Sequence, residues 1–232
     1  MQIPVAQLKD RLAIQTNQLL QPGSLPNPCL TLVTNRHLCT TRSLTQVISA
    51  AVAGGVNLVQ LREKDLNRDE LLRLAYEVRN ITYGKASFLI NGGRNIAIKC
   101  KAEGIHLSEK ELSYPSSKIR TSNASIIGQS VHSLVTARAA ERNGVSFIQL
   151  GTIFETSSKP AVLGIGSQIL KKVCSAIKIP VLAIGGINSS NIHEIMQTGA
   201  QGIAVIRAIM DSADPQKAAY ELRNLLEKNK VP

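Results

Sequence analysis

The sequence predicts one α/β domain folded as a closed (β/α)8 barrel, the TIM-barrel class, with a helical extension at its N-terminus. Short apolar runs alternate with segments of helical period from residue 29 to the end of the 232-residue chain, as expected when parallel strands are buried on both faces. The runs number eight, and glycine-rich or charged segments follow the last two, where such barrels bind phosphate. The first run lacks a following Gly-x-Gly-x-x-Gly, which disfavours an open dinucleotide-binding sheet.

The expected elements follow one another in strict alternation. The first strand is the apolar run at residues 29–34, and the first helix is expected at 43–53, where Gly54 follows as a stop signal. The helix at 69–79 presents its apolar residues on one face. The other strands, each a short apolar run, are expected at residues 56–61, 87–90, 104–107, 125–128, 147–150, 179–184 and 202–206. The other helices are expected at residues 95–100, 135–143, 167–177, 190–198 and 215–228.

Residues 1–28 differ from the repeating part of the chain. Apolar residues at helical spacing between residues 5 and 20 predict a short amphipathic helix, and the Pro-rich residues 21–28 predict a linker. We therefore expect an N-terminal extension at 1–28 and the barrel at 29–232. No chemistry is assigned to the extension.

The composition disfavours several classes of protein. The formal net charge is +11, but the basic residues are scattered and the chain has no Trp and only three Phe, so it lacks an aromatic platform for stacking bases. No apolar run approaches the ~18 residues that span a bilayer, and the N-terminus has no secretory-signal pattern. The four Cys show no Cys-x-x-Cys spacing, against a metal site or disulfide framework. We expect a cytoplasmic protein without a nucleic-acid or membrane partner.

Two cations and an amide follow the second expected strand. Gln60, Arg62 and Lys64 alternate with Leu61 and Glu63, so the first three are expected to share a face toward the barrel mouth. An Arg guanidinium offers a planar fork to phosphate oxygens, and Lys offers a movable charge. The segment predicts anion binding, with a solvated strand end as the alternative.

The third and fourth strands are followed by groups of another kind. Asn91 offers an amide to a heteroaromatic ring edge, and Gly92 lets the backbone approach closely; an ordinary turn is the alternative. His106 lies inside an apolar strand, so we expect a hydrogen-bonded core histidine. Glu111 lies beyond that strand and either reaches the site or starts a surface helix.

A serine and a histidine follow the fifth strand. Ser130 and His132 are two residues apart and are expected to point the same way. The ordinary pKa of histidine suits proton transfer near neutrality, so His132 is a candidate acid/base.

Loops with phosphate-binding character follow the last three strands. The loop after the sixth strand is rich in hydroxyls, ends in a cation and can fold over a phosphate. Backbone amides after the seventh can cradle a phosphate, and a cation at the end of the eighth adds charge. The candidates are Thr156, Ser158 and Lys159, then Gly185 and Gly186, and finally Arg207.

Together these segments resemble the thiamine phosphate synthase/TenI family of (β/α)8 barrels, from about residue 30 to residue 219. The resemblance implies a thiamine biosynthesis enzyme of one of two kinds. Synthases join hydroxymethylpyrimidine diphosphate to thiazole phosphate and release diphosphate, with Mg²⁺ on the leaving group. Thiazole tautomerases shift a proton on a thiazole phosphate carboxylate, with histidine as acid/base.

The chain mixes features of both kinds. Its residues that match substrate-binding positions of synthases are Gln60, Arg62, Lys64, Asn91, Ser130 and Lys159. However, Gly92 stands where the synthase pattern has a metal-binding aspartate, Glu111 matches the second aspartate, and Arg207 matches a serine. Because Mg²⁺ in proteins usually takes one or two carboxylates, this loss favours the tautomerase, which needs no metal.

The sequence-based hypothesis is therefore a thiazole tautomerase-like isomerase with His132 as acid/base, a phosphorylated thiazole as substrate and no cofactor. The phosphate would bind Gly185, Gly186 and Arg207, and the carboxylate would bind Arg62 and Lys64. One alternative is a Mg²⁺-dependent thiamine phosphate synthase, with Glu111 as metal ligand; another is a non-catalytic regulator that binds a phosphorylated ligand. Homo-oligomer formation is left open. The full predicted substrate-binding set is Gln60, Arg62, Lys64, Asn91, Ser130, Thr156, Ser158, Lys159, Gly185, Gly186 and Arg207.

Overall fold

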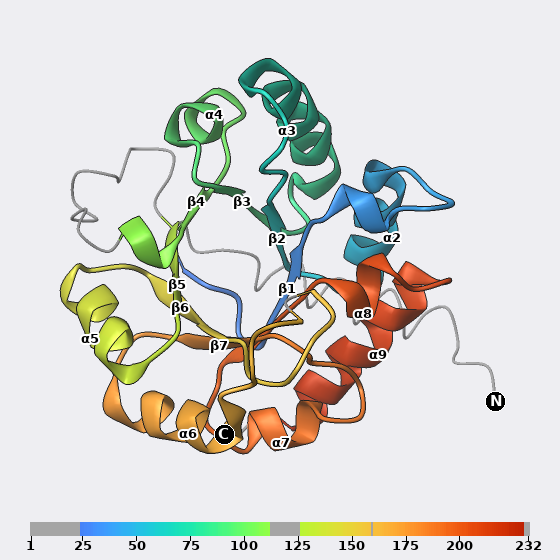
Figure 1. Ribbon diagram of the computed structural model, residues 1–232. Helices are drawn as coiled ribbons and strands as arrows, with labels where there is room; N and C mark the ends of the chain where they lie inside the picture. The colour runs from blue at the N-terminus through green and yellow to red at the C-terminus, as the bar shows by residue number, and fades with distance from the viewer. Residues whose placement is uncertain (1–23, 112–125, 159, 230–232) are drawn as a thin grey trace.

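Eight parallel strands close into a barrel in the computed structural model, which describes residues 24–111, 126–158 and 160–229 (Figure 1). Each strand pairs with the next in the sequence, and β8 pairs with β1. The predicted (β/α)8 barrel is confirmed. The strands are β1 (Cys29–Val33), β2 (Leu58–Leu61), β3 (Ser87–Asn91), β4 (Gly104–Leu107), β5 (Ile126–Val131), β6 (Phe147–Gly151), β7 (Val181–Ile184) and β8 (Gly202–Val205).

Helices lie around most of the barrel in the view of Figure 1, and between β4 and β5 the described residues form only a short 3-10 turn. They are α2 (Leu44–Ala53), α3 (Arg68–Thr82), α4 (Arg94–Lys99), α5 (Leu134–Arg142), α6 (Gly166–Ala176), α7 (Ile192–Met196), α8 (Arg207–Met210) and α9 (Pro215–Lys228). Two 3-10 turns follow β1 and β4: η1 (Arg36–Leu38) and η2 (Glu109–Glu111). These two turns and α8 were not predicted, because three or four residues are too few for a helical period to be visible.

Two elements differ from expectation in ways that affect the candidate site. β5 runs on to Val131, so Ser130 lies inside the strand and not beyond it. β8 ends at Val205, and Arg207 opens α8 instead of ending the strand. The predicted helix between residues 5 and 20 lies outside the described residues. The division into 1–28 and 29–232 stays a prediction, although β1 does begin at Cys29.

Side chains at the mouth-side ends of the helices fix where the βα loops stop. Ser43 and Gln46 form a reciprocal capping box at the start of α2, and Asn67 and Glu70 form another at the start of α3. Each box satisfies helix N–H groups that lack a partner within the helix. The loops between strand and helix are therefore held at both ends.

The barrel interior has two layers of different chemistry. The lower layer, toward the amino ends of the strands, is apolar and consists of Cys29, Leu58, Leu89, Ile126, Phe147 and Leu182. Since side chains two residues apart on a strand point the same way, the next layer toward the carboxyl ends is formed by residues two positions further on. That upper layer is mostly polar: Thr31, Gln60, Asn91 and Gln149 have polar side chains, Gly128 has none, and Ile184 is apolar. A separate, larger apolar cluster fills the space between strands and helices.

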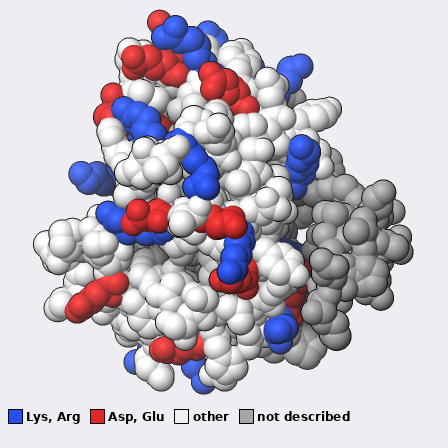
Figure 2. All heavy atoms as spheres, turned by 90° about the vertical axis from the view of Figure 1, so that its right-hand side faces the viewer, with Lys and Arg blue, Asp and Glu red and all other residues white. Residues whose placement is uncertain are grey.

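No helix in the part of the chain that the structure describes has the length and apolar character needed to cross a membrane. Figure 2 shows the face that carries α2, α8 and α9, where basic and acidic side chains are interleaved and do not form one extended basic surface.

Candidate functional site

Three amide side chains form a buried chain of hydrogen bonds across the barrel mouth. Gln149 Nε2 donates to Gln60 Oε1 (3.0 Å), and Gln60 Nε2 donates to Asn91 Oδ1 (2.8 Å). Gln60 and Gln149 are each 2% exposed, and buried amides are costly unless they are paired in this way. The chain of bonds holds the Asn91 oxygen toward Gln60, so the Asn91 amide nitrogen points the other way, away from Gln60.

A neutral histidine supports the other side of the mouth. His106 Nε2 lies 2.9 Å from Ser130 Oγ, and the ring packs on Phe147 at 5.9 Å between centroids. Burial, helped by the positive charge of Arg62, lowers the pKa of His106 to about 3, so the imidazole is neutral near pH 7. The prediction of a hydrogen-bonded core histidine is confirmed.

The residues after β2 differ in how far they are buried. Leu61 and Glu63 are buried, 1% and 4% exposed, while Arg62 is half-buried and Lys64 exposed. The Arg62 N–H donates to Thr34 Oγ1 (2.9 Å). Arg62 is therefore placed by a backbone contact next to the buried amides, and Lys64 lies further out at the rim.

Two glutamates of η2 lie at the rim beyond β4. Glu109 Oε2 accepts from the His132 N–H (2.7 Å) and lies 3.0 Å from His132 Nδ1. Partial burial opposes ionisation of Glu109, but hydrogen bonds from His132 and Thr136 outweigh it and hold the pKa of that carboxyl below its ordinary value. Glu111 Oε2 accepts from the Ser108 N–H (2.8 Å) and hydroxyl (2.7 Å).

The loops after β6 and β7 are packed together. Gly185 and Gly186 have φ of +105° and +66°, and a Cβ on Gly186 would lie 2.6 Å from the Glu155 carbonyl oxygen. The positive φ and this close approach both require glycine. Phe154 N–H donates to the Gly185 carbonyl (3.1 Å). Two predicted phosphate loops thereby come side by side.

The hydroxyls of the loop after β6 lie near a surface hollow. Ser158 N–H donates to Thr156 Oγ1 (3.3 Å). Thr156 also lines a hollow of about 360 Å³ that is formed by this loop alone. Lys159 lies outside the described residues, so its predicted role stays a prediction.

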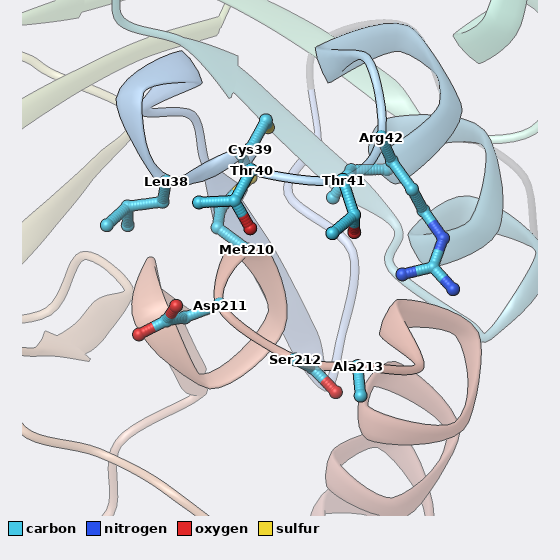
Figure 3. A pocket seen from close by; sticks show the side chains of 10 residues that line it. Leu38, Cys39, Thr40, Thr41, Arg42, Met210, Asp211, Ser212 and Ala213 are labelled. Carbon is cyan, nitrogen blue, oxygen red and sulfur yellow. The ribbon is translucent and has the colours of Figure 1, made fainter.

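Arg207 is held along its own short helix. Its Nη1 donates to Asp211 Oδ2 at 3.0 Å. Asp211 lines a cavity of about 350 Å³ between the β1–α2 loop and α8 (Figure 3). The Arg207 side chain, 40% exposed, is thus committed to a local ion pair at the edge of the mouth.

The structure brings some predicted residues together and separates others. Gln60, Asn91 and Ser130 take part in hydrogen bonds of the polar barrel interior, whereas His132 is 46% exposed at the rim. Sequence analysis missed Gln149, which is two residues after Phe147 in a strand. The period-two rule, applied to β6 as it was to β2, would have identified it.

Comparisons with known proteins bear on what this site does. The family model described as thiamine monophosphate synthase matches residues 30–209. The chain belongs to this family. The thiamine-phosphate synthase of Clostridium botulinum (strain Hall) is 39% identical over 197 residues, 83% of this chain and 95% of that protein. That of Clostridium acetobutylicum is 34% identical over 201 residues, 86% of this chain and 95% of the other.

A solved structure agrees with these relatives. The thiamine phosphate pyrophosphorylase of Pyrococcus furiosus superposes with a TM-score of 0.79 and 33% identity, covering 88% of this chain and 98% of that one. Family membership, expected from the sequence, is confirmed.

The preference for a tautomerase within the thiamine monophosphate synthase family is wrong. The relatives at 34–39% identity are named thiamine-phosphate synthases, which are transferases and not isomerases. The preference depended on the carboxylate missing at Gly92. Mg²⁺ sites of this type need only one or two carboxylates besides substrate phosphates, so one substitution does not exclude a synthase. His132, half-exposed and paired with Glu109, loses the acid/base role that this preference assigned to it.

Proposed function

We propose that this protein is a thiamine-phosphate synthase, a transferase that joins hydroxymethylpyrimidine diphosphate to thiazole phosphate and releases diphosphate. The observation that carries the proposal is its 39% identity over 83% of the chain to a protein of that name. The polar barrel interior supports it, because buried amides below a cationic rim suit a substrate with a heteroaromatic ring and a diphosphate.

The amides suit the pyrimidine ring. Gln60 and Asn91 lie at the bottom of the mouth, and their orientation is held by Gln149. Amide groups both donate and accept hydrogen bonds, as the ring nitrogens and amino group of a pyrimidine require. In this proposal Ser130, oriented by His106, completes the polar wall of the ring site.

The cations suit the diphosphate. Arg62 supplies a planar fork and Lys64 a second positive charge at the rim. We assign Thr156, Ser158 and Lys159 of the loop after β6 to the same group. The backbone of Gly185 and Gly186, beside that loop, is assigned to the phosphate of the thiazole. Arg207 is assigned to that phosphate as its cation, which requires the pair with Asp211 to open.

The reaction exchanges one bond for another. The thiazole nitrogen forms a C–N bond to the pyrimidine methylene carbon, and the carbon–oxygen bond to diphosphate breaks, with the electron pair leaving on oxygen. Arg62 and Lys64 stabilise the negative charge that develops there, which a preorganised site does without reorganisation at the moment of reaction.

The donor set is compatible with Mg²⁺. In the described residues no group of three or more His, Cys, Asp or Glu side chains could hold a metal by itself. A hard cation bound mainly by diphosphate oxygens needs fewer protein ligands. Glu111, whose Oε2 is oriented by Ser108, would be its carboxylate. When bound, the ion would supply further neutralisation of the leaving group.

The test is product formation by the purified full-length chain. With both substrates and Mg²⁺, thiamine phosphate and inorganic diphosphate should appear in equal amounts, and neither substrate alone should give product. EDTA should lower the rate. Arg62→Ala should lower kcat/KM roughly 10- to 100-fold, because it removes charge stabilisation from the transition state. Absence of product over a broad range of Mg²⁺ concentrations would contradict the proposal.

A further inference from the structure

Beyond their last paired residues, β1 and β2 stay joined through side chains. Thr34, fully buried just after β1, donates its N–H to the Gln60 carbonyl (3.0 Å) and accepts the Arg62 N–H on Oγ1 (2.9 Å). The Thr34 hydroxyl therefore accepts a backbone N–H that would otherwise bond to a carbonyl of the neighbouring strand. The backbone of Arg62 is thus fixed from β1.

Two carboxylates continue this connection outward. Both oxygens of Glu63 accept the Arg36 N–H (3.1 Å each), and Arg36 Nη1 lies 3.2 Å from Glu63 Oε2. Asp65 accepts Nη1 and Nη2 of Arg36, both at 2.6 Å, in a planar two-point contact. His37 Nε2 lies 3.0 Å from Asp65 Oδ2. We call Thr34, Arg36, Glu63 and Asp65 the β1–β2 clasp.

The two halves of the clasp differ in burial. The Glu63 side chain is 2% exposed and needs its partners, since an unpaired buried carboxylate is strongly unfavourable. The Asp65 side chain is 51% exposed, and an exposed ion pair contributes little to stability. The short two-point contact between Arg36 and Asp65 therefore affects the relative position of the loops after β1 and β2 more than it affects the stability of the fold.

The other side of the β1–α2 loop is less closely packed. Residues Leu38, Thr41 and Arg42 line the cavity of about 350 Å³, across from Ser212 and Ala213 of the α8–α9 connection (Figure 3). The loop therefore has room to shift toward α8 when it is released from the β2 side. Its position relative to β2 depends on the clasp.

The clasp residues alternate with the proposed anion-binding residues. Glu63 and Asp65 flank Lys64, and Glu63 follows Arg62 directly, so holding these two carboxylates also holds the short backbone segment that carries both cations. We propose that the β1–β2 clasp positions Arg62 and Lys64 for the diphosphate of the substrate, a role that rests on the proposed synthase function. Arg36 and Asp65 are then positioning residues that do not touch the substrate.

The test compares Asp65→Asn and Arg36→Lys with Glu227→Gln. Glu227 forms an ion pair with Arg223 on α9 (2.9 Å) and is 42% exposed, which makes it a matched control away from the mouth. In Asp65→Asn and Arg36→Lys, KM for the pyrimidine diphosphate should rise roughly 10-fold while kcat changes less than about threefold, because misplaced cations weaken binding of an anion. Asp65→Glu should recover most of the affinity, and Glu227→Gln should behave like the unsubstituted protein. Unchanged KM in both clasp variants would overturn the proposal, and so would a loss that follows the thermal midpoint alone.

A second measurement separates this inference from the proposed function. Amide hydrogen exchange without substrates should be faster over residues 62–65 in Asp65→Asn than in the unsubstituted protein and in Glu227→Gln. If the unsubstituted protein forms no thiamine phosphate, the proposed function fails, and the exchange result alone decides about the clasp. Equal exchange in all three proteins then refutes it.

Discussion

The lower and upper layers of the barrel interior lie on the same strands but differ in how their side chains interact. In the lower layer, Phe147 and its five apolar neighbours pack with almost no exposed surface. Two residues further along the strands, Gln60 and Gln149 are as deeply buried but bonded to one another. Apolar contacts need no particular partner, whereas each amide needs its own. The lower layer therefore provides stability, and the upper layer fixes the orientation of the polar groups at the barrel mouth.

The junction between the layers is sterically tight. A Cβ on Gly128 would lie 2.3 Å from Phe147 Cζ and 2.6 Å from His106 Nδ1. Gly128 therefore lets the largest side chain of the lower layer reach under the neutral histidine of the upper one. The comparison predicts that substitutions in the lower layer change mainly the free energy of unfolding, whereas substitutions in the upper layer change mainly activity.

The largest effect is expected in the lower layer. Phe147→Ala should lower the free energy of unfolding by about 3–5 kcal/mol, because it removes buried apolar contacts and leaves a cavity. Urea unfolding followed by circular dichroism measures this. Val135→Ala, at a side chain on α5 that is 76% exposed, should change it by less than about 0.5 kcal/mol. Similar losses of unfolding free energy in Phe147→Ala and Val135→Ala would show that the lower layer contributes no more to stability than an exposed position does.

A smaller effect, but mainly on activity, is expected in the upper layer. Gln60→Leu removes one bond to Asn91 and one from Gln149. It should lower kcat/KM about 10- to 100-fold, or about 1.5–3 kcal/mol of transition-state stabilisation. The loss of unfolding free energy should be smaller than that of Phe147→Ala. Full activity in Gln60→Leu would show that the hydrogen-bonded amides Gln149, Gln60 and Asn91 do not contribute to the reaction.

The pH dependence of stability sharpens the role of His106. Its pKa is about 3 in the folded protein and 6.5 ordinarily, so below pH 6.5 the unfolded chain takes up a proton that the folded protein refuses. The stability that the neutral His106 contributes to the folded protein is fully present above pH 6.5 and is lost as the pH falls toward 3. From pH 7 to pH 5 it should cost about 2 kcal/mol of unfolding free energy.

Unfolding of the unsubstituted protein and of His106→Gln at both pH values isolates this contribution. The difference between the two proteins should shrink as the pH falls. A pH-independent difference would show that His106 does not stay neutral inside the barrel.

Much of the site was predictable because strand alternation is local. The period-two rule placed Gln60 and Ser130 toward the polar barrel interior correctly. The rule says less about His132, which follows Val131, the last residue of β5, and pairs with Glu109 at the rim. Alternation holds only while the strand continues, and the sequence does not mark that end.

The sequence by itself determined the barrel class, the eight apolar strands and the polar residues that alternate with them, because these depend on which neighbouring side chains are buried. Only the tertiary structure decided which of those residues meet. Gln60 and Gln149 are 89 positions apart and bond across the barrel, and Arg36 joins Glu63 and Asp65 from another loop. The first contact arises when the sheet closes on itself, and the second arises when β1 pairs with β2. Neither is visible in a local sequence pattern.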